Sequence, residues 1–123
     1  MSYISAQLRQ LVIQRATERC EYCGLSQEGQ EATFHIDHVI PKVAGGQASS
    51  ENLALACVSC SLHKSAREEA IDPQSSKPVP LYNPRRDSWD KHFRFVGPLT
   101  MPAVALNFIT WMYLPQLFYL FVM

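Results

Sequence analysis

The sequence predicts a small α+β domain that contains a metal site. Near the N-terminus apolar residues recur at helical intervals, and further along apolar and polar residues alternate as in a half-buried strand. The four cysteines fall in two Cys-x-x-Cys pairs, which is the spacing of zinc ligands. With 123 residues, we expect one domain plus tails, because little of the chain is left for a second core.

The first expected element is an amphipathic helix over residues 5–19, which Ser5 can cap. Its apolar positions are Leu8, Leu11, Val12 and Ala16. Glycines and polar residues follow this helix, so a turn and a loop should lead from it to the first strand.

The middle of the chain predicts a strand, a loop, a second strand and a helix. Alternation indicates the first strand over residues 32–37, and the apolar run LALA indicates a short second strand. Between them a proline and a pair of glycines block regular structure, which favours a long, ordered loop. Helix formers then extend from Val58 to about Ala70, before Pro73 ends the helix.

Residues 71–98 predict an extended segment on the surface, because prolines interrupt regular structure there. The first of these are Pro73, Pro78, Pro80 and Pro84. Between residues 77 and 94 basic side chains outnumber acidic ones, which suits contact with phosphates. A solvated linker is the alternative interpretation of this stretch.

Residues 99–123 contain no charged side chain and are numerous enough to cross a membrane as a helix. Within the run lie Pro102, Asn107, Pro115 and Gln116. Because a membrane span is usually more uniformly apolar, these residues favour a hydrophobic element that packs on the domain or on a partner. Contact of the tail with a membrane stays open as the alternative.

The overall charge gives no sign of a strongly basic nucleic-acid binder. Eleven basic residues balance eleven acidic ones, so any positive patch must be local. The N-terminal residues lack the positive, then apolar, then small-residue order of a signal peptide. We therefore expect a cytoplasmic protein whose cysteines stay reduced.

Cys20, Cys23, Cys57 and Cys60 offer four thiolates, the ligand set of a tetrahedral structural zinc ion. Such a site would tie the first helix to the last one and supply folding free energy that a small core lacks. Its four protein ligands leave no open position, so it would perform no chemistry. Buried or disulfide-bonded cysteines are the alternative, which a reducing compartment disfavours.

The stretch FHIDHVIP brings together two side chains with complementary chemistry. Asp37 offers a hard oxygen ligand, and His38 offers an imidazole that titrates near neutral pH. A divalent ion on Asp37 can neutralise charge that develops on a phosphate, while His38 removes a proton from water. The pair therefore suits hydrolysis of a phosphodiester, although the dipeptide by itself has little specificity.

The complete pattern is more specific: Cys-x-x-Cys, then HIDHVIP, GG and ENLALAC, then Cys-x-x-Cys before SLHK. In this order the motifs resemble the HNH endonuclease family from about Arg15 to Arg67. The resemblance implies the ββα-metal fold, in which two strands and a helix present a catalytic divalent ion to DNA. We expect an HNH nuclease domain over residues 1–70, a proline-rich basic extension over 71–98 and the uncharged tail over 99–123.

Carried over to this sequence, the resemblance makes Asp37 a metal ligand, His38 the general base and Asn52 the residue that braces the loop. The family usually places His or Asn directly after the last cysteine as a second ligand, whereas Ser61 stands here. We expect Ser61 to bind the ion weakly or through water. Together with PLYNPRRDSWDKHF, this serine resembles a subgroup of bacterial HNH proteins, which is compatible with an active enzyme.

Basic and imidazole side chains near these motifs are candidates for substrate contact: His35, Lys42, Lys64 and Arg67. Lys64 lies three residues beyond Ser61 on the same helix face, where it can approach a phosphate. His35 shares a strand face with Asp37 and can reach the ion or a phosphate. A histidine that simply faces solvent is the alternative for this position.

These features predict a zinc-stabilised HNH endonuclease that hydrolyses phosphodiester bonds in DNA or another nucleic acid. Its cofactors would be structural Zn²⁺ and catalytic Mg²⁺ or another divalent ion, without a small-molecule cofactor. Asp37, His38 and Asn52 favour the enzyme, since a pure scaffold does not need these three groups together. The alternative is a non-catalytic zinc module that binds nucleic acid or protein, which neutral charge and Ser61 favour.

Overall fold

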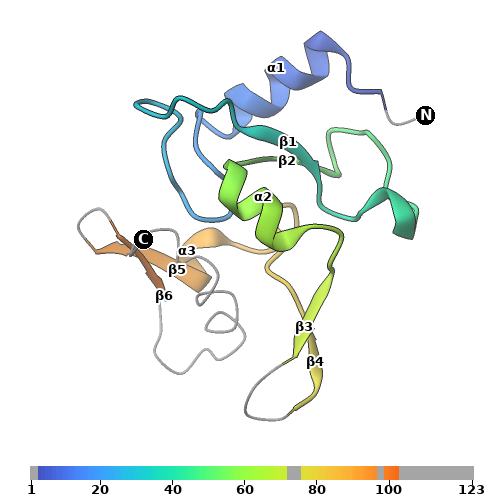
Figure 1. The fold of residues 1–123 in the computed structure, drawn as a ribbon, viewed down its shortest axis with the longest axis vertical. Helices are drawn as coiled ribbons and strands as arrows, with labels where there is room; N and C mark the ends of the chain where they lie inside the picture. The colour runs from blue at the N-terminus through green and yellow to red at the C-terminus, as the bar shows by residue number, and fades with distance from the viewer. Residues whose placement is uncertain (1–2, 72–75, 97–98, 103–123) are drawn as a thin grey trace.

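The computed structural model in Figure 1 describes residues 3–71, 76–96 and 99–102. In chain order its elements are α1 (Ala6–Arg15), β1 (His35–His38), the 3-10 turn η1 (Lys42–Ala44), β2 (Leu53–Ala56), α2 (Val58–Lys64), β3 (Glu69–Ile71), β4 (Pro78–Pro80), α3 (Trp89–His92), β5 (Phe93–Val96) and β6 (Leu99–Pro102). In these ranges no helix is long and apolar enough to span a membrane. The first four residues of the expected uncharged tail form β6, and the rest of the tail lies outside the described residues.

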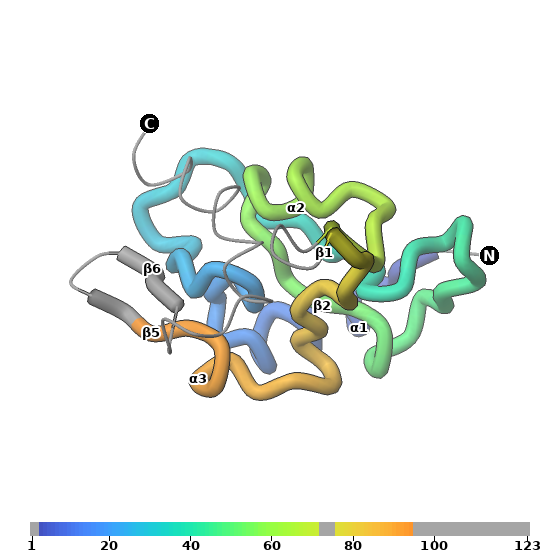
Figure 2. Tube along the Cα trace, turned by 90° about the horizontal axis from the view of Figure 1, so that it is seen from below, coloured from blue at the N-terminus to red at the C-terminus, as the bar shows by residue number. Residues whose placement is uncertain are grey.

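The predicted α+β class is confirmed, with a ββα unit at its centre. β1 and β2 pair as antiparallel strands, with His35 opposite Ala56 and His38 opposite Leu53. α1 packs on one side of this hairpin and α2 on the other, as the two views show (Figures 1 and 2). The two faces of the hairpin are therefore covered by helices from before and after it in the sequence.

β2 lies at the centre of the core. All four of its residues, Leu53–Ala56, are buried, and none is more than 2% exposed. Because helices cover both faces, this strand is apolar at every position and shows no alternation. The apolar run LALA was correctly expected to be a short strand, and burial on both sides explains its composition.

α1 begins as predicted but ends earlier than predicted. The Ser5 side chain caps it by accepting a hydrogen bond of 3.1 Å from the backbone N–H of Leu8. The expected end at residue 19 is wrong, because Thr17 and Glu18 have φ values of 53° and 58°. This left-handed backbone turns the chain out of the helix and toward the first cysteine pair.

Two other predicted boundaries also differ from the structure. β1 starts at His35 and not at residue 32, because β2 offers partners only as far as Ala56. α2 stops at Lys64 and does not run to residue 70, since Ser65 has a φ of 50°. The residues after it form β3, which pairs with β4 in a separate antiparallel hairpin.

The segment after residue 71 is not wholly the extended surface segment that its prolines predict. Tyr82 and Phe93 are only 5% and 2% exposed and belong to the main core. The Trp89 indole N–H donates a 3.0 Å hydrogen bond to the carbonyl of Tyr22, between the first two cysteines. Figure 2 shows this segment passing beside the N-terminal part of the chain. Aromatic burial therefore outweighs the tendency of the prolines to keep the segment exposed.

A polar link joins the same segment to β2. The carboxylate of Glu21 accepts a 2.8 Å hydrogen bond from the backbone N–H of Leu55, and its other oxygen pairs with Arg85. The backbone N–H of Glu21 also donates to the carbonyl of Leu55, at 2.8 Å. Glu21 thus holds the free edge of β2 on one side and the C-terminal segment on the other. Arg85 belongs to the basic stretch 77–94 that suits contact with phosphates, but its guanidinium is engaged within the fold.

We predict that Phe93→Ala lowers the free energy of unfolding by about 3–5 kcal/mol, because it removes a buried ring from the main core. Urea unfolding followed by tryptophan fluorescence measures this loss. Leu62→Ala is the matched control, since Leu62 is 71% exposed and its truncation should have little effect. An unchanged midpoint for Phe93→Ala would show that the C-terminal segment folds independently of the core.

Candidate functional site

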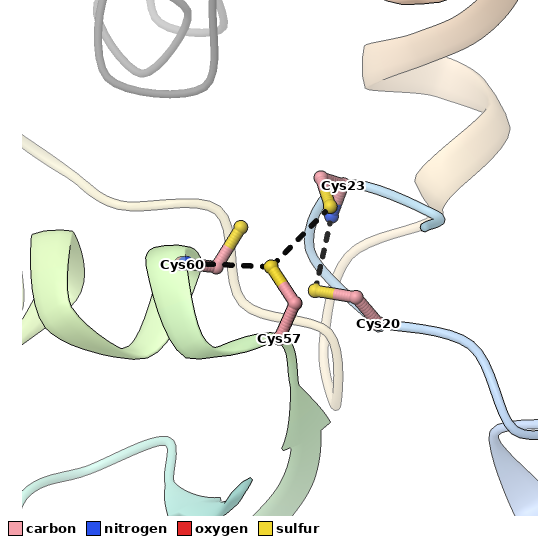
Figure 3. Close-up of side chains that lie close together, drawn as sticks. All are labelled: Cys20, Cys23, Cys57 and Cys60. Carbon is pink, nitrogen blue, oxygen red and sulfur yellow. Dashed lines mark hydrogen bonds between the residues drawn. The ribbon is translucent and has the colours of Figure 1, made fainter. Parts of the chain in front are cut away.

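The two cysteine pairs converge from distant parts of the sequence. Cys20 and Cys23 lie in the turn after α1, Cys57 is the N-cap of α2, and Cys60 lies in its first turn (Figure 3). All four side chains are buried, and their sulfur atoms lie within 4.8 Å of one another. Among the described residues, this is the one group of three or more such ligands that converges.

The spacing of the sulfur atoms fits a tetrahedral metal ion. A Zn–S distance of about 2.3 Å gives an S–S edge of about 3.8 Å, and the Cys23 and Cys57 sulfurs are 3.7 Å apart. Within each pair, the backbone N–H of the second cysteine points at the first sulfur, at 3.4 Å. None of the four is in a disulfide. The four cysteines are therefore positioned to bind a metal ion and could hold zinc.

The four thiols also influence one another's ionisation. Hydrogen bonds from the other cysteines, Cys20 first, hold the pKa of Cys57 far below its usual value. The same contacts raise the pKa of Cys23 and Cys60. The pKa of Cys20 is also lowered, although burial opposes this. Without a cation the cluster thus favours thiolates at Cys57 and Cys20 over Cys23 and Cys60, and ionisation of all four thiols needs a positive charge in its centre.

Asp37 lies in β1 opposite Ala54, at the end of the hairpin that faces the long loop. Within the described part of the chain, its carboxylate has neither a hydrogen-bond donor nor an ion-pair partner. Its charge nevertheless acts on Lys64, where it raises the pKa against the lowering effect of burial. A carboxylate near a buried ammonium, with both oxygens open to a ligand, can bind a cation.

His38 is the last residue of β1, and its ring is partly enclosed. Its Nε2 atom is buried and has no hydrogen-bond partner among the described residues, which leaves Nδ1 to meet solvent. Burial lowers the pKa of His38, as do the charges of Lys42 and Lys64, while Asp37 raises it. Strand alternation directs Asp37 and His38 to different faces, although the charge of Asp37 still acts on the His38 ring.

Lys64 and His38 are joined through the backbone. The Lys64 side chain is 9% exposed, and its Nζ donates a 3.2 Å hydrogen bond to the carbonyl of His38. The contact between Lys64 and a substrate phosphate stays a prediction. Arg67, the other predicted phosphate ligand on this segment, is exposed and donates to the carbonyls of His63 and Lys64.

Asn52 spans the loop that follows His38. Its Oδ1 accepts a 2.8 Å hydrogen bond from the backbone N–H of Ile40, and its Nδ2 donates to the carbonyls of Ile40 and Gln47, both at 3.0 Å. Its backbone carbonyl accepts from Val39, at 2.8 Å. The two ends of the loop are therefore tied to one side chain, which is the geometry that the brace predicted for Asn52 requires.

Gly46 makes this brace possible, and the sequence showed it only as a breaker of regular structure. A Cβ at this position would lie 1.7 Å from the carbonyl oxygen of Ile40 and 2.8 Å from Nδ2 of Asn52. The neighbouring Gly45 has a φ of 89° and closes the turn, with nothing near its missing Cβ. The glycine pair thus combines one left-handed residue with one close backbone approach.

Arg15 contributes to the site without having been predicted to do so. Its guanidinium donates to the carbonyls of Ser50, at 2.8 Å, and Leu53, at 2.7 Å. It therefore fixes the end of the loop and the start of β2 against α1. No spacing in the sequence links an arginine in the first helix to carbonyls more than thirty residues later, so only the fold reveals this role.

Ser61 and His35 are brought together by the packing of α2 on β1. Ser61 Oγ lies 2.9 Å from His35 Nδ1, at hydrogen-bonding distance. His63 is engaged elsewhere, because its Nδ1 donates to the carbonyl of Ser59 at 2.7 Å. The predicted role of Ser61 as a metal ligand is not tested by this contact.

We predict that Gly46→Ala destabilises the protein by about 1–3 kcal/mol, because the added methyl group pushes the Ile40 carbonyl away from Asn52. The control is Gly45→Asn, which should be almost neutral, since asparagine tolerates left-handed backbone. Thermal unfolding measures both effects. Equal losses for the two variants would mean that turn geometry matters and the close approach at Gly46 does not.

The comparison with protein families agrees with this geometry. Residues 20–67 match the family model described as HNH endonuclease. This match starts at the first cysteine and includes the β1–β2 hairpin, the loop and α2. The search of curated proteins gave no match to the chain. Residues 20–67 therefore match the HNH endonuclease family, to which the motifs point.

Proposed function

We propose that the protein is a divalent-metal-dependent endonuclease that hydrolyses phosphodiester bonds in DNA. The observation that supports this most is the fixation of His38 from both sides. Lys64 holds its carbonyl, and Asn52 holds the two residues that follow it. A general base needs such fixed placement, because misplacement of the reacting groups slows the reaction.

In the proposed mechanism the chain supplies a base, a cation ligand and a rigid frame. Asp37 would hold the divalent ion, which when bound supplies positive charge for the phosphate and the leaving oxygen. His38 would take a proton from water through Nδ1, and its lowered pKa keeps the imidazole neutral and able to accept it. Asn52 would act as a positioning residue, because its side chain bonds to the backbone that follows His38.

The substrate would approach across the surface beside this frame. A cleft of about 370 Å³ runs from Ile40 in the loop to the C-terminal segment, and Lys64, Arg67 and Arg86 contribute to its lining. Exposed guanidinium groups bind phosphates without regard to base sequence. Glu68 and Glu69 also line the cleft, so the positive field there is modest. We propose DNA as the partner on the basis of the HNH family and this local charge.

We propose that the four cysteines hold zinc and that this ion has a structural role. Four thiolates complete the coordination of zinc, which leaves no position for water or substrate. The reduced thiols also suit the cytoplasm, where metal binding competes with little oxidation.

Two observations favour a non-catalytic nucleic-acid-binding module as the second candidate. The hydroxyl of Ser61, where the family usually has a ligand, is within hydrogen-bonding distance of His35. The buried ammonium of Lys64 also acts on Asp37, and this positive charge opposes a cation there. Both features would weaken ion binding, so the two candidates differ in whether the ion binds at all.

We predict that the purified chain contains about one zinc ion and that Cys57→Ser loses it together with folded structure. Elemental analysis and circular dichroism measure both. Ser59→Ala, on the same helix, is the control and should keep the metal. Because the cysteine variant is expected to unfold, Co²⁺ substitution of the parent gives a second reading through thiolate charge-transfer absorption. A metal-free parent that stays folded would contradict the prediction.

We predict that His38→Ala slows plasmid nicking by about 100-fold or more, as expected for loss of a general base. The assay uses the zinc-loaded full chain with Mg²⁺ or Mn²⁺, and gel electrophoresis separates nicked from supercoiled plasmid. His63→Ala is the matched control and should nick at the parent rate, because its ring bonds to its own helix.

The outcomes of this assay separate the two candidate functions. Equal nicking by the parent and His38→Ala would rule out the proposed base. Absence of nicking by both, with zinc present and the fold intact, would favour the binding module. Retained DNA binding in a gel-shift assay would then identify nucleic acid as its partner.

A further inference from the structure

The contact between His35 and Ser61 determines which nitrogen of His35 remains available. The two atoms at 2.9 Å are Nδ1 of the ring and Oγ of the serine. If Nδ1 carries the proton and donates it to Oγ, the lone pair of the neutral ring lies on Nε2. Within the described residues Nε2 has no partner, and the His35 side chain is exposed. This nitrogen is therefore open to a ligand from solvent.

The fold places His35 beside Asp37 on one face of β1, because side chains two residues apart point the same way. α2 lies along this hairpin (Figure 1). Ser61 contacts His35, and one helical turn further Lys64 reaches the backbone of His38. The strand β1 and the helix α2 therefore run side by side. The open Nε2 of His35 and the open carboxylate of Asp37 lie on the same face of β1.

We propose that His35, through Nε2, is the second protein ligand of the divalent ion that Asp37 binds, and that Ser61 is its positioning residue. The inference rests on the proposed function and deepens it by naming a ligand and a metal class. Ser61 acts by fixing the tautomer and orientation of the ring, as hydrogen-bond partners of metal-bound histidines commonly do. A ligand on the strand thus takes the place of the ligand that the helix lacks.

An imidazole ligand changes which ion the site prefers. A site of carboxylate and water oxygens suits Mg²⁺, whereas a nitrogen ligand shifts selectivity toward Mn²⁺, Co²⁺ and Ni²⁺. The nearby ammonium of Lys64 weakens purely electrostatic binding of any cation. The nitrogen therefore contributes most for ions that form a directional bond with it. We expect the protein to bind Mn²⁺ more tightly than Mg²⁺.

The test measures binding of Mn²⁺ alone to the zinc-loaded full chain, without DNA. Loss of the free Mn²⁺ signal in electron paramagnetic resonance gives the affinity, and pulsed measurements report a directly bound nitrogen. We predict that His35→Ala weakens binding at least about 10-fold and removes the nitrogen signal. Ser61→Ala should weaken binding by a smaller factor, and Ser61→Thr should restore it because the hydroxyl is kept.

His63→Ala is the matched control, since it removes an imidazole from the neighbouring helix and should leave Mn²⁺ binding unchanged. Zinc content and the unfolding curve check that each variant is folded. Unchanged affinity with a persisting nitrogen signal in His35→Ala would overturn the proposal and point to His38. Absence of Mn²⁺ binding by the parent would overturn it as well. Mg²⁺-dependent nicking that is lost in His38→Ala would leave the proposed function standing in either case.

Discussion

The convergence of four thiols is the constraint on which the rest of the structure depends. α2 has only seven residues, and helices of this length are not stable alone in water. Its start is fixed because Cys57 is both the N-cap of the helix and a member of the cysteine cluster. The segment after α1 is held at the same point. The helix is thereby presented to β1 in one register, with Ser61 and Lys64 facing the strand.

A second set of contacts fixes the loop between the strands without using a metal. Asn52 bonds to backbone on both sides of the loop, and Gly46 permits the close approach that this needs. Arg15 holds the end of the loop from α1. These are directional bonds to backbone carbonyls and amides, so they fix position more than they add stability. The region around His38 is consequently rigid on the side of the loop and on the side of α2.

Much of the central unit could be predicted from the sequence, because its signals are local. The cysteine spacing, the apolar run at Leu53–Ala56 and the cap at Ser5 each depend on a few neighbouring residues, and each is found as expected. The helix ends were missed because the residues with left-handed backbone are Thr17, Glu18 and Ser65, not glycine. Their conformation is imposed by contacts made elsewhere, which composition does not record.

The packing of the C-terminal segment could not be predicted, because its aromatic residues follow no period. Tyr82, Trp89 and Phe93 stand among prolines and charges, yet their rings contact one another in the fold, with centroids 5.2 Å and 5.5 Å apart. Tyr82 and Trp89 both contact Tyr22, which lies in the first cysteine turn. The match between a turn and a distant cluster of rings is a property of the folded chain alone. The roles of Arg15 and Glu21 could not be predicted for the same reason. Both side chains bind backbone groups that lie more than thirty residues away in the sequence.

Lys64 contributes both to the packing of α2 on β1 and to the electrostatics around Asp37. Burial disfavours its ammonium, and the charges of Asp37 and Glu68 offset part of this cost. The positive charge of a protonated Lys64 therefore interacts with the carboxylate of Asp37. The same charge competes with a cation, so binding through oxygen alone is weakened. The ammonium does not repel neutral ligand atoms or substrate phosphates. These groups can therefore supply the further ligands with which a site with one carboxylate binds an ion.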